Sequence, residues 1–314
     1  MCRCCTTKVT IILERCDFQP VTLANRDLFR AHYAKYPQVH SDNTFTNMVC
    51  WNHYAHYEYA YVDGSIILAS TIGGKTRYRP PIGPRNRDLF QAVLDLAIET
   101  GDDELPVNVI DTETKAWLAR EFPDLRPVPD QDHFEYVYLS RDLAGLSGGN
   151  YLTIRRQLNR FRKNCSYRVE PVTPDIEKDL NDFLKKWCEW KGCDTDPVLA
   201  NEKDAIYFAV KHFAEIGLSG LVIRVDDVIA SMALFEGMNP TTALVHFEKG
   251  LPDCEGIYKA INAETASLLE KNYLYINRES DLGVPGLREA KQRYHPHHMI
   301  EIYSLLRSTL PALS

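Results

Sequence analysis

The chain has 314 residues with a formal net charge of -7, and 45% of its residues are hydrophobic and 25% charged. These proportions provide enough apolar material for a packed core and exclude a chain that is disordered throughout. No run reaches the roughly 18 apolar residues of a membrane span, and the apolar run at residues 9–13 is too short for a signal peptide. We therefore expect a cytoplasmic protein without a membrane span, made of about two domains.

The nine cysteines are an odd number and are scattered along the chain, so no disulfide framework is expected. Cys2, Cys4 and Cys5 could be soft-metal ligands, but no second Cys/His pair lies at zinc spacing. We interpret residues 1–17 as a flexible tail and expect no metal site. Cys188 lies in a predicted helix between two tryptophans, which fits a packing role better than a redox role.

The first half of the chain alternates strand-like and helix-like segments. Two β-rich runs flank Asp63 and Gly64, a two-residue turn signal that predicts a β-hairpin. An amphipathic helix, a short strand, a second helix and another strand are then predicted at residues 88–99, 106–110, 111–122 and 133–139. This order predicts a mixed α/β domain.

The second half has the same alternation over a longer span. Three predicted helices are followed by three strand-like runs, a helix, a strand, a helix and a last strand. Their ranges are 151–163, 174–191, 202–216, 220–225, 228–237, 242–248, 256–271, 273–277, 286–294 and 298–305. The order after the third helix is similar to the core of the GNAT acyltransferase fold. We expect two tandem domains of this α/β class, residues 18–140 and 141–314, each a mixed, mostly antiparallel sheet flanked by helices.

Polar residues crowd the segment that follows the predicted buried strand at residues 273–277. Asn277, Glu279 and Asp281 come directly after this strand, where α/β sheets place their ligand sites. We therefore take Asn277, Glu279 and Asp281 as candidate catalytic residues. The alternative is a salt-bridged loop packed between the domains.

The continuation of this segment has the residues of a binding loop and a polar helix face. Gly283 and Gly286 let the backbone turn tightly and approach a ligand. Arg288, Lys291 and Tyr294 follow at helical spacing, so they share one face of the next helix. These five residues are candidates for substrate binding.

A second candidate region lies where the predicted strand at residues 242–248 ends. Glu248 could act as a general base toward an amine, and the alternative is a surface ion pair with Lys249. The N-terminus of the next helix can meet an anionic ligand. Tyr258 and Asn262 of that helix could line the same groove, or could belong to a face packed on the sheet.

One helix is densely cationic, although the net negative charge argues against a broad surface for a polyanion. Arg155, Arg156, Asn159 and Arg160 lie on this predicted helix and, with Lys249, could bind the phosphates of a donor or of an RNA end. The alternative is a solvated helix face. If tRNA is the donor, its binding should weaken steeply with salt.

Together these segments are similar to the family of phosphatidylglycerol lysyltransferase C-terminal-domain-like proteins. The resemblance covers residues 18–303, and its motifs are F-x-N-x-x-x-W at 45–51, RRxLNRF at 155–161, EKG at 248–250 and NRExDLGxPGLRxAKxxYxP at 277–296. It implies a tandem of two GNAT-like domains and kinship with Fem-type peptidyltransferases and the catalytic domain of lysyl-phosphatidylglycerol synthases. Those relatives transfer an aminoacyl group from aminoacyl-tRNA to an amine or a lipid hydroxyl.

The resemblance therefore implies an acyl- or aminoacyltransferase with an amine or hydroxyl acceptor, carried by a small molecule or a peptide. The donor would be an acyl-CoA or an aminoacyl-tRNA, with no covalently bound cofactor. The sequence has no counterpart of the membrane-embedded half of the lipid-modifying enzymes, so we do not expect a lipid acceptor. It also lacks the Q/R-x-x-G-x-G/A pyrophosphate loop between Glu248 and Gly256, which argues against acetyl-CoA. The alternative is a non-catalytic ligand- or peptide-binding protein on a GNAT-like scaffold.

Overall fold

The computed structural model describes residues 11–310, which form two compact units built from segments distant in the sequence. The first unit takes the described parts of Met1–Val21, Ala55–Pro129 and Ile302–Ser314, and the second takes Thr22–Tyr54 and Asp130–Glu301. The units therefore differ from the two continuous domains that the sequence suggested. No helix within the described residues is both long and apolar enough to cross a membrane.

The structure also differs from the predicted flexible tail at residues 11–17, the part of the tail that it describes. Residues 1–10, which include the cysteine-rich start, lie outside the described residues. Leu13 is buried in the core of the first unit, and the Arg15 guanidinium donates to the Glu58 carboxylate. Residues 11–17 therefore pack on the first unit.

The first unit contains a seven-stranded sheet in the order β1-β2-β3-β4-β5-β14-β6. Its strands are β1 (Gln19–Pro20), β2 (Glu58–Val62), β3 (Ser65–Ile72), β4 (Lys75–Tyr78), β5 (Val107–Asp111), β6 (Val128–Pro129) and β14 (Ile302–Leu305). Its main helices are α4 (Arg87–Thr100) and α5 (Thr112–Glu121). The predicted hairpin is confirmed, because β2 and β3 pair antiparallel across Asp63 and Gly64. Asn86 caps α4 by accepting from two backbone N–H groups, and the helix buries its apolar stripe on the sheet.

The second unit contains another seven-stranded sheet, in the order β13-β7-β12-β11-β10-β9-β8. Its strands are β7 (Glu135–Leu139), β8 (Tyr167–Pro171), β9 (Ser219–Val225), β10 (Val228–Asn239), β11 (Thr242–Gly250), β12 (Tyr275–Asn277) and β13 (His298–Ile300). The helices are α1 (Arg26–Tyr33), α2 (Phe45–Cys50), α3 (Asn52–Ala55, at the unit boundary), α6 (Ser140–Gly145), α7 (Leu152–Asn164), α8 (Glu177–Lys191), α9 (Pro197–Lys211), α10 (Phe213–Ile216), α11 (Ile257–Leu269) and α12 (Pro285–Gln292).

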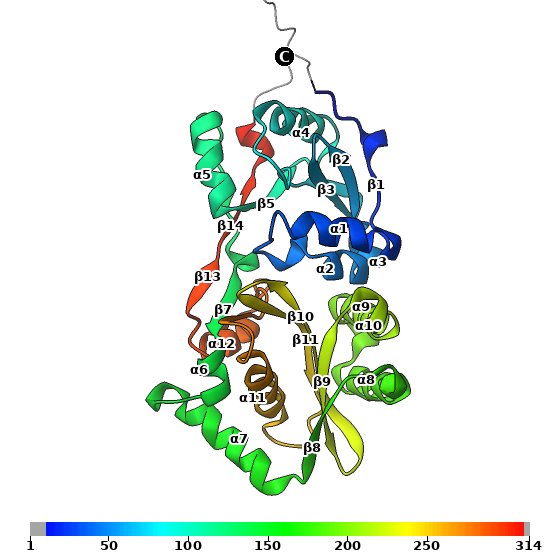
Figure 1. The fold of residues 1–314 in the computed structure, drawn as a ribbon, viewed down its shortest axis with the longest axis vertical. Helices are drawn as coiled ribbons and strands as arrows, with labels where there is room; N and C mark the ends of the chain where they lie inside the picture. Colours follow the sequence, from blue (N-terminus) through cyan, green and yellow to red (C-terminus); the bar gives the residue numbers. More distant parts are fainter. Residues whose placement is uncertain (1–10, 311–314) are drawn as a thin grey trace, which may run out of the picture. The chain divides into compact units, whose positions relative to one another are not determined.

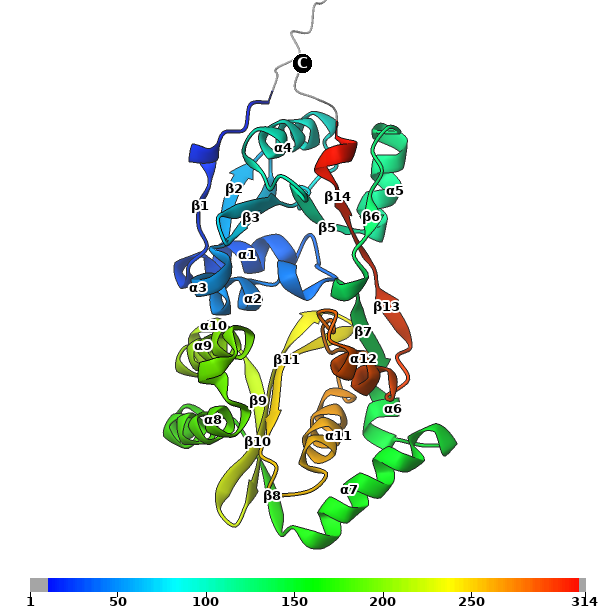
Figure 2. The ribbon, with the colours of Figure 1, turned by 180° about the vertical axis from the view of Figure 1, so that it is seen from behind.

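Helices cover both faces of the second sheet. Helix α11 lies against β10 and β11 on one face, and α8 packs on the opposite face, as the two views show (Figure 1 and Figure 2). All strand pairs of this sheet are antiparallel except β11 with β12. The expected fold class is thus confirmed: two mixed, mostly antiparallel sheets flanked by helices, with a GNAT-like order in the second.

Helix α7 packs closely against the start of α11. The predicted stripe of Ile154, Leu158 and Phe161 is buried in the same core as α11. Gly256 precedes α11 with φ +91°, and a Cβ atom there would lie 2.5 Å from the carbonyl oxygen of Gln157. A glycine is therefore required both for its backbone conformation and for the approach of α7.

Substitution of this glycine is expected to destabilise the protein. Gly256→Ala should lower the free energy of unfolding by about 1–3 kcal/mol, because it adds left-handed strain and a backbone clash. Urea denaturation measures the change. Gly149→Ala is the matched control, since nothing lies within 4 Å of a Cβ at Gly149. Equal effects of the two substitutions would contradict the close packing of α7 on α11.

Candidate functional site

The site of the second unit lies where its two parallel strands diverge. Strands β11 and β12 pair only from Thr242 with Tyr275 to Leu244 with Asn277. Strand β11 then continues to Gly250, while the chain after Asn277 leaves the sheet. A groove of about 910 Å³ opens there, and its walls come from β11, the start of α11, the segment after β12, α12, and the α8–α9 region. A cavity of this size can hold a small-molecule substrate.

A largely buried ion pair lies in this groove. The Arg278 guanidinium donates to Glu248 Oε1 at 3.0 Å, and Asn262 Nδ2 donates to Glu248 Oε2 at 3.3 Å. The two charged side chains are only 15% and 11% exposed. Arg278 also lies over the rings of Tyr294 and Tyr138, at 5.0 and 5.9 Å from their centroids. Glu248 is therefore held in a fixed orientation by an arginine and an amide.

Lys249, the sequence neighbour of Glu248, has a different partner. Its ammonium pairs with Glu202 at 2.6 Å and lies 4.7 Å from the centroid of the Trp187 ring. Lys249, Glu202 and Trp187 all line the groove. The surface ion pair between Glu248 and Lys249, considered as an alternative from the sequence, is therefore wrong.

Two further lysines line the groove and have lowered pKa values. Burial, followed by the charge of Arg278, lowers the pKa of Lys291 to about 8. Its ammonium donates to the carbonyl oxygens of Arg278 and Glu279. Burial and Arg278 also lower the pKa of Lys259, which lies 4.9 Å from the centroid of the Tyr294 ring. An amine whose pKa is near neutral can exchange protons with a substrate.

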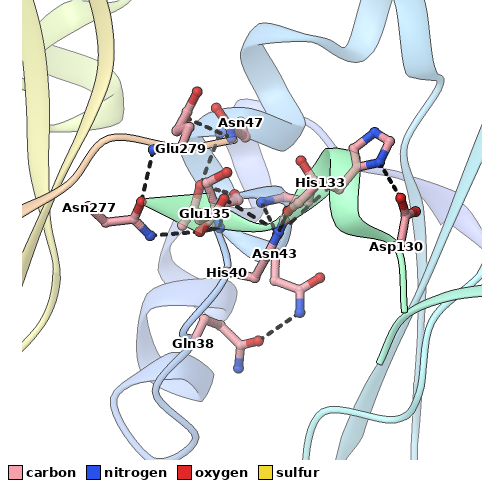
Figure 3. A network of polar contacts seen from close by, with 12 residues as sticks. Gln38, His40, Asn43, Asn47, Asp130, His133, Glu135, Asn277 and Glu279 are labelled. Carbon is pink, nitrogen blue, oxygen red and sulfur yellow. Dashed lines mark hydrogen bonds and ion pairs between the residues drawn. The ribbon is translucent and has the colours of Figure 1, made fainter. Parts of the chain in front are cut away.

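A buried polar network anchors the chain where it leaves β12 (Figure 3). Asn277 is fully buried, donates to Glu135 Oε2 at 2.6 Å and accepts from the backbone N–H of Glu279 at 2.8 Å. Glu135 also accepts from the backbone N–H of Ser41, and burial raises its pKa. Asn277, predicted as catalytic, thus lies beneath the loop and not among the residues that line the groove.

Glu279, the next predicted residue, does line the groove. Its φ of +58° is unusual for a residue with a side chain. Oε1 of Glu279 accepts from Asn47 Nδ2 at 3.3 Å and lies 3.2 Å from His246 Nδ1. His246 Nε2 lies 2.9 Å from Glu236 Oε1. Burial alone would lower the pKa of His246, but the hydrogen bonds to Glu236 and Glu279 raise it to about 9.

Asp281 and Arg288 form a second polar cluster, which lines a separate cavity of about 290 Å³. Asp281 accepts two bonds from Arg288, at 2.8 and 2.9 Å, and one from Tyr136 at 2.6 Å. Burial would raise the pKa of Asp281, but these bonds and the N–H of Gly283 lower it to about 2. Gly283 has φ +72°, and a Cβ there would lie 2.8 Å from the Asp132 carboxylate. This cluster shapes the loop and does not line the large groove.

The cationic helix α7 does not place its predicted phosphate-binding residues in the groove. Arg155 donates to backbone carbonyl groups, one of them Gly148 O at 2.6 Å, and Arg160 pairs with Glu255. Arg156 and Asn159 are exposed. None of these four lines the groove, whereas Gln157 of the same helix does. Of the predicted phosphate-binding residues, only Lys249 therefore has a place in the groove.

The remaining predicted residues divide between the groove and its support. The groove is lined by Tyr258, Gly286, Lys291 and Tyr294. Asn262 does not line it but donates to Glu248.

Sequence reasoning missed several groove residues. They are Arg278, Lys259, His246, Trp51, Trp190 and Glu202. Arg278 stood inside the motif at residues 277–296, and its place directly after a buried strand was the signal that could have found it.

Cys188, near the end of α8, forms a disulfide with Cys193, a pairing that the sequence did not predict. Within residues 11–310, no group of three His, Cys, Asp or Glu side chains is placed to hold a metal ion.

Comparison with known proteins identifies relatives across nearly the whole chain. The family profile described as "Phosphatidylglycerol lysyltransferase, C-terminal" matches residues 33–306. A search of curated proteins found no match. A solved protein of unknown function from Bacteroides thetaiotaomicron is 29% identical over 92% of this chain and 98% of its own, with a TM-score of 0.85.

Two more distant structures share the fold. The C-terminal domain of a candidate lysylphosphatidylglycerol synthetase from Agrobacterium fabrum has a TM-score of 0.64 at 15% identity, covering 90% of this chain and 92% of that one. FemX has a TM-score of 0.57 at 11% identity, covering 93% of this chain and 98% of that one. The resemblance inferred from the sequence motifs is thereby confirmed.

Proposed function

This chain belongs to the phosphatidylglycerol lysyltransferase C-terminal family, and on this basis we propose that its second unit transfers an activated acyl or aminoacyl group to an amine or hydroxyl acceptor. The observation that carries the proposal is the largely buried pair of Glu248 and Arg278 in a groove that opens between diverging parallel strands. The pair lies beside Lys291, an amine able to release a proton near neutral pH. Group transfer needs positioning and charge stabilisation, and these residues supply both.

The reaction is the attack of an amine or hydroxyl on an activated carbonyl carbon. A bond forms from the attacking nitrogen or oxygen to this carbon, and the bond to the leaving oxygen or sulfur then breaks. Glu248 orients the attacking group by accepting its hydrogen bond and takes up the proton that this group loses as the new bond forms. Arg278 offsets the negative charge that develops on the carbonyl oxygen, and Lys291 gives a proton to the leaving group.

We propose aminoacyl-tRNA as the donor in preference to a CoA thioester. Between the end of β11 and the start of α11 the chain carries Pro252, Asp253 and Glu255. A proline lacks the backbone N–H that a pyrophosphate needs, and two carboxylates repel it. Binding of uncharged tRNA should therefore be measurable and weaken steeply with salt, whereas CoA should not displace it. Displacement of tRNA by equimolar CoA would contradict this choice of donor.

The proposed role of Glu248 has a direct test. Glu248→Gln should lower kcat/KM for transfer by at least about 100-fold, because the amide cannot accept as a carboxylate does and does not pair with Arg278. The assay follows a labelled group from aminoacyl-tRNA or acyl-CoA pools to amine and hydroxyl acceptors.

Glu264→Gln is the matched control for this substitution. Glu264 lies on α11 and pairs with Arg162 at 3.3 Å outside the groove. It should leave transfer unchanged. Equal activity of the Glu248→Gln variant and the wild type would overturn the assignment of the groove, and ligand binding without transfer from either donor pool would favour a binding protein.

A further inference from the structure

We propose that His246 is a positioning residue of the groove, which fixes the Glu279 carboxylate so that its second oxygen receives the ammonium group of a substrate. This inference deepens the proposed function and rests on it, since the ammonium would belong to the donor's aminoacyl group or to an amine acceptor.

Both ring nitrogens of His246 face oxygen acceptors, and Nδ1 has the Asn47 amide oxygen at 3.1 Å beside the carboxylate of Glu279. Nε2 lies 2.9 Å from Glu236 Oε1, and Nδ1 lies 3.2 Å from Glu279 Oε1. A neutral imidazole has one N–H and one lone pair, so it could satisfy only one of these carboxylates and would repel the other. The imidazolium satisfies both, and its side chain is shielded from solvent. The arrangement therefore requires a protonated ring.

A β-bulge places this ring beside the groove. Leu234 pairs with Phe247 and Phe235 pairs with Val245, so His246 is the extra residue on β11. Successive residues of a regular strand point to opposite faces of the sheet. Here the adjacent Val245 and His246 both line the groove.

Glu279 is held in place through both its backbone and its side chain. Its N–H is bound by Asn277, and its carbonyl oxygen accepts from the Tyr136 N–H at 3.2 Å and from Lys291 at 3.2 Å. Its Oε1 is occupied by Asn47 and His246. Within the described residues no hydrogen bond reaches Oε2, although the side chain is 28% exposed and lines the groove.

The charged and titratable groups around His246 come from several elements. Glu236 belongs to β10, Glu279 follows β12, and Cys50 of α2 faces the same two carboxylates. Burial raises the pKa of the Cys50 thiol, which therefore stays neutral. One imidazolium between two carboxylates leaves this cluster of three side chains with one negative charge, next to the Lys291 ammonium that donates to the Glu279 carbonyl oxygen. This charge favours a cationic group, and an ammonium supplies both the charge and the N–H donors that Oε2 can accept.

The test compares two small probes that differ in one charge. L-alaninamide and N-acetyl-L-alaninamide are titrated near pH 7 while chemical shifts of the protein are recorded by NMR. The wild type should bind the free amine at least about tenfold more tightly, because only the ammonium pairs with Glu279. His246→Gln and Glu279→Gln should lose this preference. A role in stability alone would not change the ratio of the two affinities.

Two controls keep the outcome decisive. His212→Gln removes another histidine that pairs with a glutamate, Glu215 at 2.8 Å, but lies outside the groove, and it should keep the preference. The imidazole nitrogens of wild-type His246 should both carry protons near pH 7.5, which nitrogen-15 shifts report without any substitution. A neutral ring, no preference in the wild type, or an unchanged preference in His246→Gln would each overturn the proposal.

The titration and the labelled-transfer assay together separate this inference from the proposed function. If the wild type transfers no group, but its preference for the free amine is lost in the His246→Gln variant, the proposed function fails and the subsite stands. If transfer is observed and His246→Gln keeps both the preference and the KM of the wild type, the subsite fails alone.

Discussion

Arg278→Met is expected to lower the free energy of unfolding by about 3–5 kcal/mol and to abolish transfer. Glu248 is 11% exposed, and Arg278 is its only cationic partner among the described ion pairs. Removing the guanidinium leaves a buried carboxylate held only by Asn262 at 3.3 Å. The free energy of desolvation is then no longer offset by the ion pair. Urea denaturation measures the stability, and the labelled-transfer assay measures the activity.

A double variant separates stability from chemistry. Arg278→Met with Glu248→Gln removes both charges, so it should regain much of the stability that Arg278→Met loses. It should stay inactive, because neither the orienting carboxylate nor the cation is present. Arg168→Met is the surface control, since Arg168 is half exposed in its pair with Asp227 and should change stability by less than about 1 kcal/mol. A loss of this small size in Arg278→Met would show that the pair is not buried in solution.

The stability advantage of the wild type over His246→Gln is expected to fall by roughly 3 kcal/mol between about pH 6 and about pH 10. The pKa of His246 is raised from 6.5 to about 9 in the folded protein. The folded state therefore holds the proton more tightly than the unfolded state. The stabilisation is fully present below pH 6.5 and is lost as the pH rises through 9.

Comparison with His246→Gln separates the contribution of His246 to stability from that of Lys291, which has the opposite pH dependence. The pKa of Lys291 is lowered to about 8 in the folded protein. Between pH 8 and the lysine's usual 10.5 the unfolded state therefore binds more protons, and the contribution of Lys291 to stability rises with pH. Both proteins carry Lys291, so this contribution cancels in their difference. Urea denaturation at three pH values is sufficient. A difference that stays constant with pH would mean that His246 is not held as an imidazolium.

The order of elements in the fold could be predicted because it depends on local patterns. The stripe of Ile154, Leu158 and Phe161 predicts a buried helix face, and the structure has it. The path of the chain between units could not be predicted in this way. Residues 22–54 belong to the second unit and bring Asn47 to its site, while β14 pairs with β5 and β6 in the first. Such pairing depends on contacts between distant segments, which hydrophobic periodicity does not report.

The groove residues could also be predicted only where they follow a local pattern. Polar residues directly after a buried strand identified the region of Glu279 and Lys291, since strand ends place ligand sites. The partner of Glu248 was missed, because Arg278 comes from another strand end and not from the adjacent Lys249. The arginines of α7 are a related case. Spacing revealed a cationic face, but not that Arg160 pairs with Glu255.

The central claim is that group transfer takes place at the Glu248–Arg278 pair. It is tested most directly by single-turnover transfer of a labelled aminoacyl group from aminoacyl-tRNA, with the wild type and the Arg278→Met, Glu248→Gln double variant compared side by side. Circular dichroism first establishes that the double variant is folded. We predict transfer by the wild type and none above background by the folded double variant. Transfer at the wild-type rate by the double variant would contradict the claim.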